Sequence, residues 1–442
     1  MIPRDFPVSE AFPLICPVGP HQLTKTGSLI TAIELGGSDP DAQTDQDAVT
    51  LSMLSRVIYG ALPNNCSVSE YYIHGGSEEI RLRDREDPLS HKVSKAREAA
   101  LNKRGLARSR LIHVIQMHDP NDWNGYLSTT LIKNLPMFFL SRESRQTVLS
   151  RLRRPNALIL RERELEARAE ALSRAADDAA AKWSLAMSAR RLRRDEFWPL
   201  LRFFATFNPL FLDPAYKAPA PVDDCDVALA SGDIVPVKLN HEDALRLNGA
   251  ETRYCRIASI HKTPKNPIGL WSKGPDPIIG RPGNFILQNH YTPLSAIQQT
   301  FSFKAARTRV DRTRVDLFSL FVGDDFLDTK DERLAIRQKI EQLEQAEALD
   351  DTWATQFAQL VLFDESPLKL KQSVINFNNS LEAKGFSLVW EGVGLPMAFQ
   401  SLQPGGEAKS IRQATVSSSR AAALSLVNRA NNGCRLVEDL NG

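Results

Sequence analysis

Residues 28–36 read SLITAIELG, a run of aliphatic and β-branched side chains bounded by glycines. This composition predicts a buried β-strand. Residues 38–49, SDPDAQTDQDAV, supply turn formers and then the acidic side chains that favour a helix N-terminus. From residue 45 to residue 62 apolar side chains recur every three or four positions, which predicts an amphipathic helix. Its expected buried stripe consists of Val49, Met53, Leu54, Val57, Ile58 and Leu62.

The alternation of strand and helix continues along both halves of the chain. After the first helix the pattern predicts a strand at 66–74, a helix at 88–104 and a strand at 110–117. The second half predicts strands at 252–261, 357–363 and 386–390, a helix at 368–381, a helix from residue 294 onward, and another that carries Ile336, Ile340 and Leu343. The expected fold class is α+β, with two subdomains of mixed or antiparallel sheet covered by helices and a long projecting helical segment.

Shifts in composition place the boundaries between the parts of the chain. Its 442 residues are enough for about two to three domains. The expected parts are an N-terminal α/β subdomain at 1–141, a helical arm with an aromatic helix at 142–212, a linker at 213–236, a second α+β subdomain at 237–402 and a connector at 403–442. The linker is assigned from its proline, aspartate and alanine content.

The overall composition excludes several classes of protein. With 42% hydrophobic and 24% charged residues, the chain is neither collagen-like nor disordered throughout. A net charge of +2 does not indicate a nucleic-acid-binding protein. The five cysteines form no C-x-x-C pair, which argues against a disulfide framework and a zinc site and favours a reducing compartment. The start of the chain lacks the pattern of a signal peptide, and no apolar run is long enough to span a membrane, so we expect a cytoplasmic location.

Residues 142–187 are rich in arginine, glutamate, alanine and leucine. This composition predicts a long helical stretch that projects from the core, interrupted near Pro155 because proline removes a hydrogen-bond donor. Glutamates such as Glu162 and Glu166 interleave with the arginines. An exposed helix held by salt bridges is therefore favoured over a nucleic-acid contact, which stays open as an alternative.

A basic cluster leads into an aromatic helix at 197–212. The residues that we expect to face a membrane or a partner are Arg190, Arg191, Arg193, Arg194, Trp198, Phe203, Phe207 and Phe211. Such a segment is suited to lie against anionic inner-membrane headgroups or a small membrane subunit. The alternative is a helix that is buried on two sides between the domains.

The chain lacks the phosphate-binding sequence G-x-x-x-x-G-K-[ST]. The nearest stretch, GGEAKS at 405–410, has alanine at the second glycine position and is interpreted as a polar surface loop. LVLFDE at 360–365 resembles the strand whose Asp364 and Glu365 would serve a metal-bound phosphate in an ATPase. Without a phosphate loop, we interpret it as a strand that ends before a helix starting near Pro367. No catalytic residue, metal site or cofactor site is predicted in this chain.

Two stretches carry a resemblance to a known family. Residues 27–62 resemble the opening strand, turn and first helix of the type IV secretion and conjugal-transfer ATPases, the fourth VirB component with its TrbE and CagE relatives. Residues 360–406 are similar to the strand, helix and strand of that family and to the leucine-proline-glycine tail before its ATPase core. Residues 417–426 resemble its short connector, with Arg420 where asparagine is commoner.

This resemblance implies the N-terminal docking and assembly domain of an ATPase that energises conjugative DNA or effector transfer. The domain would be cytoplasmic and peripheral at the inner membrane, and its partners would be inner-membrane and cytoplasmic subunits of the secretion system. Hexamer formation, and the binding of ATP and magnesium, would belong to a C-terminal domain beyond Gly442, so this chain alone is expected to be inactive. The alternatives are a stand-alone adaptor or scaffold without motor activity, and an arginine-rich nucleic-acid-binding module.

Overall fold

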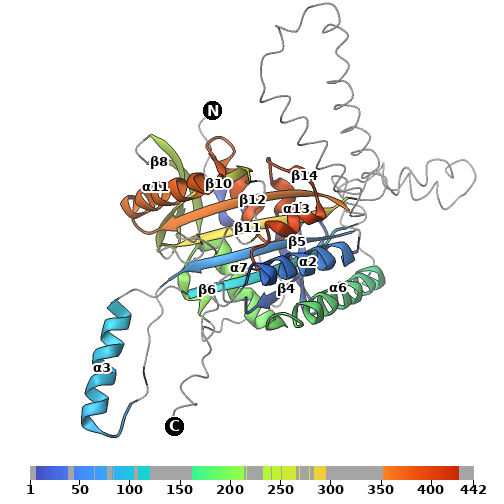
Figure 1. Cartoon of the computed structure of the whole chain (residues 1–442). Helices are drawn as coiled ribbons and strands as arrows, with labels where there is room; N and C mark the ends of the chain where they lie inside the picture. Colours follow the sequence, from blue (N-terminus) through green and yellow to red (C-terminus); the bar gives the residue numbers. More distant parts are fainter. Residues whose placement is uncertain are drawn as a thin grey trace, which may run out of the picture.

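The computed structural model describes residues 6–37, 44–63, 65–76, 82, 84–103, 108–119, 162–213, 216, 232–239, 241–249, 251–264, 268, 278, 283–294 and 352–427. The fold is α+β (Figure 1). Among the described residues, 14 strands form one sheet, and every strand pairing in it is antiparallel.

The strands come from both halves of the chain. They are β1 (Phe6–Pro7), β2 (Leu14–Val18), β3 (His21–Thr24), β4 (Leu29–Leu35), β5 (Cys66–Gly75), β6 (Arg108–Met117), β7 (Ala189–Arg191), β8 (Asp233–Leu239), β9 (Glu242–Asn248), β10 (Thr252–Lys262), β11 (Phe285–Pro293), β12 (Trp353–Asp364), β13 (Ser387–Trp390) and β14 (Ala414–Ser417). Their order is β1-β8-β9-β10-β12-β11-β5-β6-β4-β3-β2, while β13, β14 and β7 pair with β10, β12 and β4.

The sheet joins the two expected subdomains. Strand β11 pairs with β5 along its length, from Phe285↔His74 to Tyr291↔Val68. The sections 1–141 and 237–402 therefore share one sheet and do not have separate ones. Strand β8 begins inside the expected linker, so residues 233–236 are part of the sheet.

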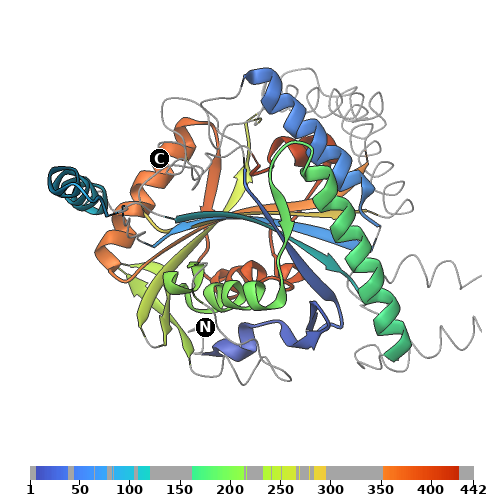
Figure 2. The same cartoon turned by 90° about the horizontal axis from the view of Figure 1, so that it is seen from below.

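Helices cover both faces of this sheet (Figure 2). The described helices are α1 (Val8–Ala11), α2 (Asp45–Ala61), α3 (Pro88–Lys103), α6 (Glu162–Trp183), α7 (Arg194–Thr206), α11 (Pro367–Ala383), α12 (Leu395–Leu402) and α13 (Ser418–Ala423), with the short 3₁₀ helices η1 (Pro209–Leu212) and η2 (Glu407–Lys409). One apolar core lies between the sheet and α2, α6, α11 and α13, which we call the α2 face. A second lies between the sheet and α1, α7, η1 and α12, which we call the α7 face.

Several strands and helices agree with the prediction from local sequence patterns. The predicted strands at 28–36, 66–74, 110–117, 252–261, 357–363 and 386–390 correspond to β4, β5, β6, β10, β12 and β13. The predicted helices at 45–62, 88–104 and 368–381 correspond to α2, α3 and α11. The helices expected from residue 294 onward and around Ile336 lie outside the described residues.

Helix α2 buries a face that overlaps only partly with the predicted one: Ile58 and Leu62 are buried and Leu54 packs against the core. Met53 and Val57, expected in the core, are 61% and 57% exposed. The buried positions are Ala48, Leu51, Ser52, Ser55, Ile58 and Tyr59. Helix α13, whose sequence is SSRAAA, packs closely against α2. Small side chains let two helices approach, so serine and alanine here occupy positions that apolar periodicity alone assigns to larger residues.

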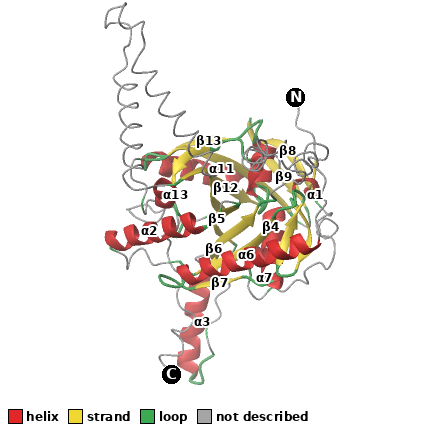
Figure 3. Ribbon diagram, turned by 90° about the vertical axis from the view of Figure 1, so that its right-hand side faces the viewer, coloured by secondary structure: helices red, strands yellow, loops and turns green. Residues whose placement is uncertain are grey.

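The expected projecting arm requires correction. Residues 120–161 lie outside the described part of the chain. Helix α6, which is the described part of the arm, packs against β4 and β6 and buries Leu172, Ala176, Ala179 and Trp183. These residues recur at helical spacing and form an apolar stripe, so α6 does not project. The described helix that stands away from the sheet is α3 (Figure 3).

None of the described helices is long and apolar enough to cross a membrane. No disulfide joins the described cysteines Cys16, Cys66 and Cys255. Burial raises the pKa of the Cys66 thiol to about 12, so this group stays protonated and unreactive near neutral pH.

Candidate functional site

The aromatic residues expected to face a membrane are buried. Trp198, Phe203, Phe207 and Phe211 are at most 6% exposed and belong to the core of the α7 face. Phe207 stacks on Phe363 of β12 with a centroid distance of 4.9 Å. The helix packs on the sheet in the same core as η1 and α12, which explains why apolar side chains lie on several of its sides: the sheet and the neighbouring elements all need an apolar contact surface. A docking surface made of these four rings is therefore excluded. The helix is buried, as the alternative expected, but on one face of a shared sheet and not between two domains.

The basic cluster before this helix is neutralised by nearby carboxylates. Arg190 forms ion pairs with Glu34 at 2.6 Å and with Glu196 at 2.7 Å. Arg191 lies 3.4 Å from Asp177, and Arg193 lies 3.5 Å from Asp195. Arg194 is the first residue of α7 and is partly buried. These arginines join β7 to neighbouring elements and do not form an uncompensated basic patch.

Gly405, Gly406 and Glu407 are buried, in contrast to the expected surface loop, whereas Lys409 is exposed. A side chain at Gly405 would collide with Thr24 at 2.7 Å. The backbone N–H groups of Gly406, Lys409 and Ser410 donate to carbonyls within the same turn. A phosphate cradle requires such N–H groups to point at the ligand, so this turn does not provide one.

Asp364 and Glu365 have structural partners. The carboxylate of Asp364 accepts a hydrogen bond from the Ser366 N–H at 2.8 Å, and α11 begins with Pro367. Glu365 forms an ion pair with Arg253 at 2.9 Å. The interpretation of this sequence as a strand that ends at a helix start is confirmed.

The described histidines do not gather into a metal site. His118 Nε2 lies 2.9 Å from Ser67 Oγ, whereas His113 lies in the core beside Trp183. Across the described ranges, no group of three histidine, cysteine, aspartate or glutamate side chains is placed to hold a metal ion.

Strand β5 presents polar side chains to both faces of the sheet, because successive residues of a strand point to opposite sides. On the α2 face, Glu70 accepts four hydrogen bonds. Its donors are the Tyr59 hydroxyl, the Asn289 amide at 3.2 Å, the Ser425 hydroxyl at 2.7 Å and the Leu426 backbone N–H at 2.9 Å. Two of these donors belong to the connector, so Glu70 fixes residues 425–426 to the sheet.

On the α7 face, Glu407 of η2 turns into the core. Its Oε1 accepts hydrogen bonds from Ser69 at 2.8 Å and Tyr71 at 3.2 Å. Its Oε2 is buried and has no hydrogen-bond partner among the described residues. Burial raises the pKa of the Glu407 carboxyl, because the charged form loses its hydration.

A chain of hydrogen bonds continues from Glu407 to β11. Ser69 Oγ lies 2.7 Å from His290 Nδ1, and His290 Nε2 lies 2.8 Å from Thr292 Oγ1. If Ser69 donates to Glu407, then His290 Nδ1–H donates to Ser69 and Nε2 accepts from Thr292, which satisfies every donor. This requires a neutral imidazole, and burial lowers the pKa of His290 to about 3.

The sheet opens where two central strands separate. Strands β10 and β12 pair from Tyr254↔Asp364 to Ser259↔Gln359. Beyond that point β10 pairs with β13 through Lys262↔Ser387, and the start of β12 pairs with β14 from Trp353↔Ser417 to Gln356↔Ala414. The connector passes through this opening, from η2 on the α7 face through β14 to α13 on the α2 face.

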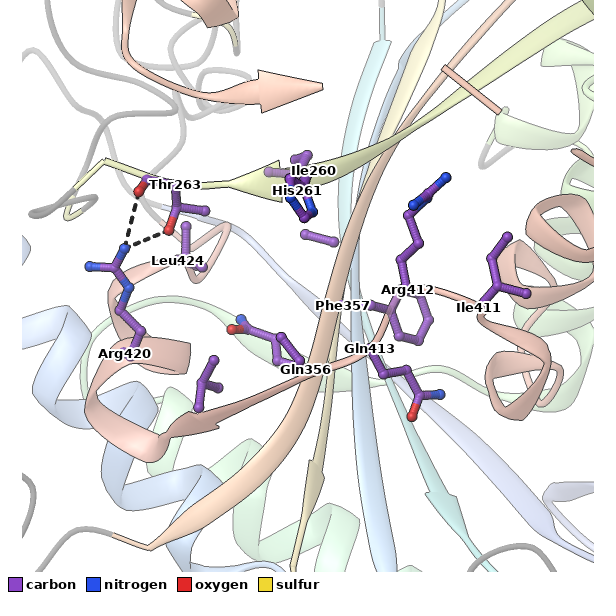
Figure 4. Close-up of a pocket in the computed structure, with 13 residues that line it drawn as sticks. Ile260, His261, Thr263, Gln356, Phe357, Ile411, Arg412, Gln413, Arg420 and Leu424 are labelled. Atoms are coloured by element: carbon purple, nitrogen blue, oxygen red, sulfur yellow. Dashed lines mark hydrogen bonds between the residues drawn. The ribbon is translucent and has the colours of Figure 1, made fainter. Parts of the chain in front are cut away.

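A pocket of about 410 Å³ occupies the remainder of the opening (Figure 4). Its lining comes from β10, from the start of β12 and from the connector: Ile260, His261, Thr263, Gln356, Phe357, Ala358, Ile411, Arg412, Gln413, Ala414, Val416, Arg420 and Leu424. The volume falls within the range of small-ligand sites, roughly 300–1,000 Å³.

Arginines stand on two sides of this pocket. The Nη2 group of Arg420 donates to the Thr263 hydroxyl at 2.5 Å and to the Thr263 carbonyl at 3.3 Å (Figure 4). It also donates to the backbone carbonyl of Pro264 at 2.7 Å. Burial lowers the pKa of the Arg420 guanidinium. Arg412 donates through Nε to Glu391 at 2.6 Å, and that carboxylate is only 2% exposed. With cations, amides and an apolar floor, the pocket is suited to bind an anionic group beside an apolar one.

Sequence patterns did not point to Glu70, Glu407 or the pocket residues as a group. The one available signal was a charged residue inside an apolar strand pattern, as at Glu70 in SVSEYYIHG. Arg420 was noticed only because it departs from the family pattern. The chain matches no protein-family model, and no curated protein has a sequence significantly similar to it.

Proposed function

We propose that this chain is the docking and assembly part of a type IV secretion ATPase, which holds the motor at the inner-membrane complex during conjugative DNA or effector transfer. The proposal starts from the resemblance of residues 27–62 and 360–406 to that family. In the fold these two stretches supply β4, α2, β12, α11, β13 and α12, which belong to one body around a single sheet.

The observation that carries the proposal is the way the connector is fastened. Residues 403–427 lie on both faces of the sheet, with Glu407 bonded to Ser69 and Tyr71 on one face and Glu70 bonded to Ser425 and Leu426 on the other. A segment held at two buried points leaves the body from a fixed position and in a fixed direction. An assembly domain needs this property to transmit its placement to a motor that follows the connector.

In this proposal ATP and magnesium belong to the motor, which would form the hexamer. The turn at 405–410 uses its N–H groups internally, and Asp364 and Glu365 have structural partners, which supports a role without ATP chemistry for this part. Titration of the purified chain with Mg-ATP is expected to give no heat of binding. Micromolar binding that Lys409→Ala abolishes would contradict this assignment.

Recruitment to the membrane tests the docking function. The chain is expressed in cells that carry the inner-membrane subunits of a conjugative type IV system and in matched cells without them. We expect the chain in the membrane fraction only when these subunits are present, together with reduced conjugation because the chain competes with the native ATPase for docking. An equal distribution in both cells would contradict the proposal.

The adaptor and nucleic-acid alternatives make different predictions. A stand-alone adaptor would be required for transfer without any linked motor, so supplying the chain separately from the ATPase core would restore transfer. A nucleic-acid-binding module would bind DNA with a steep dependence on salt concentration. The pairing of Arg190, Arg191 and Arg193 with carboxylates gives no support to the nucleic-acid alternative.

A further inference from the structure

The opening between β10 and β14 leaves two strand edges facing each other across the pocket. Beyond Ser259, β10 has no partner on the side of β12 within the described residues, and β14 pairs only with β12 there. Backbone N–H and C=O groups at such edges can add another extended segment.

The pocket has a chemical character that selects its occupant. None of the thirteen described residues that line it is acidic, whereas Arg412, Arg420 and His261 all contribute to it. Glu391 pairs with Arg412 and balances its charge. The Glu391 side chain is buried, whereas the Arg412 side chain is 40% exposed and can still be reached from the pocket. A guanidinium carries five N–H donors, so Arg412 has donors beyond the Nε that serves Glu391.

The Arg420 guanidinium is half-buried, and its Nη2 donates to oxygens of Thr263 and Pro264 at the pocket rim. A partly desolvated cation gains more from an incoming carboxylate than a fully hydrated one does, because the surrounding medium screens less. An anionic side chain that enters the pocket therefore meets guanidinium N–H donors on two sides, those of Arg420 and those of Arg412, whose charge Glu391 balances.

An apolar surface adjoins the rim. Ile411 lines the pocket and is 45% exposed, and it lies so close to Gly394 that a side chain there would meet it at 2.5 Å. Val393, next to Gly394, is 99% exposed, and Met397 follows on α12 with 44% exposed. The pocket and these side chains together offer sites for charged and apolar residues of one bound segment.

We propose that the pocket between β10 and β14 binds an extended, acidic peptide segment of a partner protein. The backbone of this segment pairs with an edge of β10 or β14 that has no partner among the described residues, one carboxylate lies between Arg412 and Arg420, and a neighbouring apolar side chain packs on Ile411. The inference rests on the proposed docking function, and it adds that the docking partner carries an acidic, extended segment.

A peptide of about eight residues, roughly 26 Å when extended, probes the site. Fluorescence anisotropy measures the binding of the purified chain to a labelled peptide of alternating valine and glutamate, with a valine-lysine peptide as control. We expect saturable binding of the glutamate peptide only. Equal binding of both peptides, or of neither, would overturn the proposal.

Charge variants at the rim locate the binding. Ile411→Glu is expected to weaken binding of the glutamate peptide roughly tenfold or more, and Ile411→Lys to strengthen it, since like charges repel and opposite charges attract. Ile375→Glu is the matched control, because Ile375 is 44% exposed on α11 and does not line the pocket. An unchanged affinity in both Ile411 variants would contradict the assignment.

Hydrogen exchange with and without the peptide identifies the strand edge. Slower exchange is expected in residues 260–263 or 411–417, and unchanged exchange in β8 and β9. Protection confined to other strands overturns the proposal, as does complete displacement of the peptide by inorganic phosphate at matched ionic strength, which would mark a site for small anions. The peptide assay contains no secretion subunit, so it is independent of the membrane-recruitment experiment. A chain that binds no peptide but is still recruited to the membrane would contradict the pocket proposal and leave the docking function intact.

Discussion

The two faces of the sheet each bury one glutamate, and the two carboxyl groups are satisfied differently. Glu70 and Glu407 are both 1% exposed. Glu70 accepts four hydrogen bonds over its two oxygens, which suits the acceptor capacity of an ionised carboxylate. Glu407 accepts two on one oxygen, and its Oε2 lacks a partner among the described residues. The α7 face therefore favours a neutral carboxylic acid.

This difference concerns function because both glutamates hold the connector. The Glu70 attachment depends on donors that keep their protons over the whole physiological range: two hydroxyls, an amide and a backbone N–H. The Glu407 attachment depends on the protonation of the glutamate itself. The comparison predicts that the Glu407 attachment is the weaker of the two and that it depends on pH.

Removing the Glu70 carboxylate should have the largest effect. Glu70→Ala leaves the Tyr59 hydroxyl, the Asn289 amide and the Leu426 N–H buried without an acceptor, and each such loss costs about 1–3 kcal/mol. We expect the free energy of unfolding to fall by about 4 kcal/mol or more, measured by urea denaturation. Hydrogen exchange in residues 424–427 should increase in any population that remains folded.

A surface glutamate provides the control for this variant. Glu170 has a side chain that is 71% exposed and pairs with Arg174 one helical turn away. Glu170→Ala should change stability by less than about 0.5 kcal/mol, as exposed pairs do. A Glu70→Ala protein that loses less than about 1 kcal/mol would show that the connector does not depend on this network.

The second-largest effect is expected from lowering the pH, which should reduce the free energy of unfolding because His290 is buried on the α7 face. Its folded-state pKa of about 3, lowered by burial and then by His118, lies below the ordinary value of 6.5. The unfolded chain therefore binds a proton first, and this contribution to stability is present above pH 6.5 and lost as the pH falls. Between pH 7 and pH 5 the expected loss is about 2 kcal/mol. His290→Gln should flatten the pH dependence of the urea midpoint, and an unchanged slope would contradict the assignment of a neutral imidazole.

Replacing Glu407 by its neutral isostere should have a smaller effect of opposite sign. Burial raises the folded-state pKa of Glu407 above the ordinary 4.5, so its stabilising contribution is full below pH 4.5 and declines as the pH rises. Glu407→Gln should remove this decline, so that the variant is close to the wild type at pH 4 and more stable than the wild type at pH 7.

The matched variant Glu70→Gln separates the two faces. An amide NH₂ donates where the Glu70 network needs an acceptor, so Glu70→Gln should destabilise the protein at both pH values. If instead Glu407→Gln destabilises and Glu70→Gln does not, the assignment of charged and neutral carboxyl groups to the two faces is reversed.

The polar side chains of this sheet also explain why some of its elements were predicted from local sequence patterns and others were not. Strands such as β4 and β12 and helices such as α2 and α11 have periodic apolar side chains, so their existence followed from the sequence. Strand β11 was not predicted, because its centre reads Gln288, Asn289, His290. These side chains are buried and bonded to Tyr71, Glu70 and Ser69 of β5. Partners more than 200 positions away leave no local signal.

The candidate site was unpredictable for a related reason. The aromatic helix α7 has apolar side chains on several sides, a pattern equally consistent with a membrane surface and with a second layer of protein. In the structure the sheet, η1 and α12 together cover these side chains, as in the contact of Phe399 with Phe207. Arg412 and Arg420 are ordinary in the sequence and become a site only where β10 and β12 separate. Their proximity depends on how the strands pair, and no local sequence pattern shows that pairing.

The smallest effect is expected at Glu365, a carboxylate that is neither buried nor part of a network. Its side chain is 66% exposed, and its partner Arg253 also pairs with Glu251. Solvent screens such a contact, and Arg253 keeps one carboxylate when the other is removed, so Glu365→Gln should cost less than about 1 kcal/mol in urea denaturation. A loss above about 2 kcal/mol would place Glu365 with the buried carboxylates. If the variant stays folded and abolishes ATP hydrolysis in a protein that includes the motor, Glu365 takes part in that chemistry, and its pairing with Arg253 is secondary.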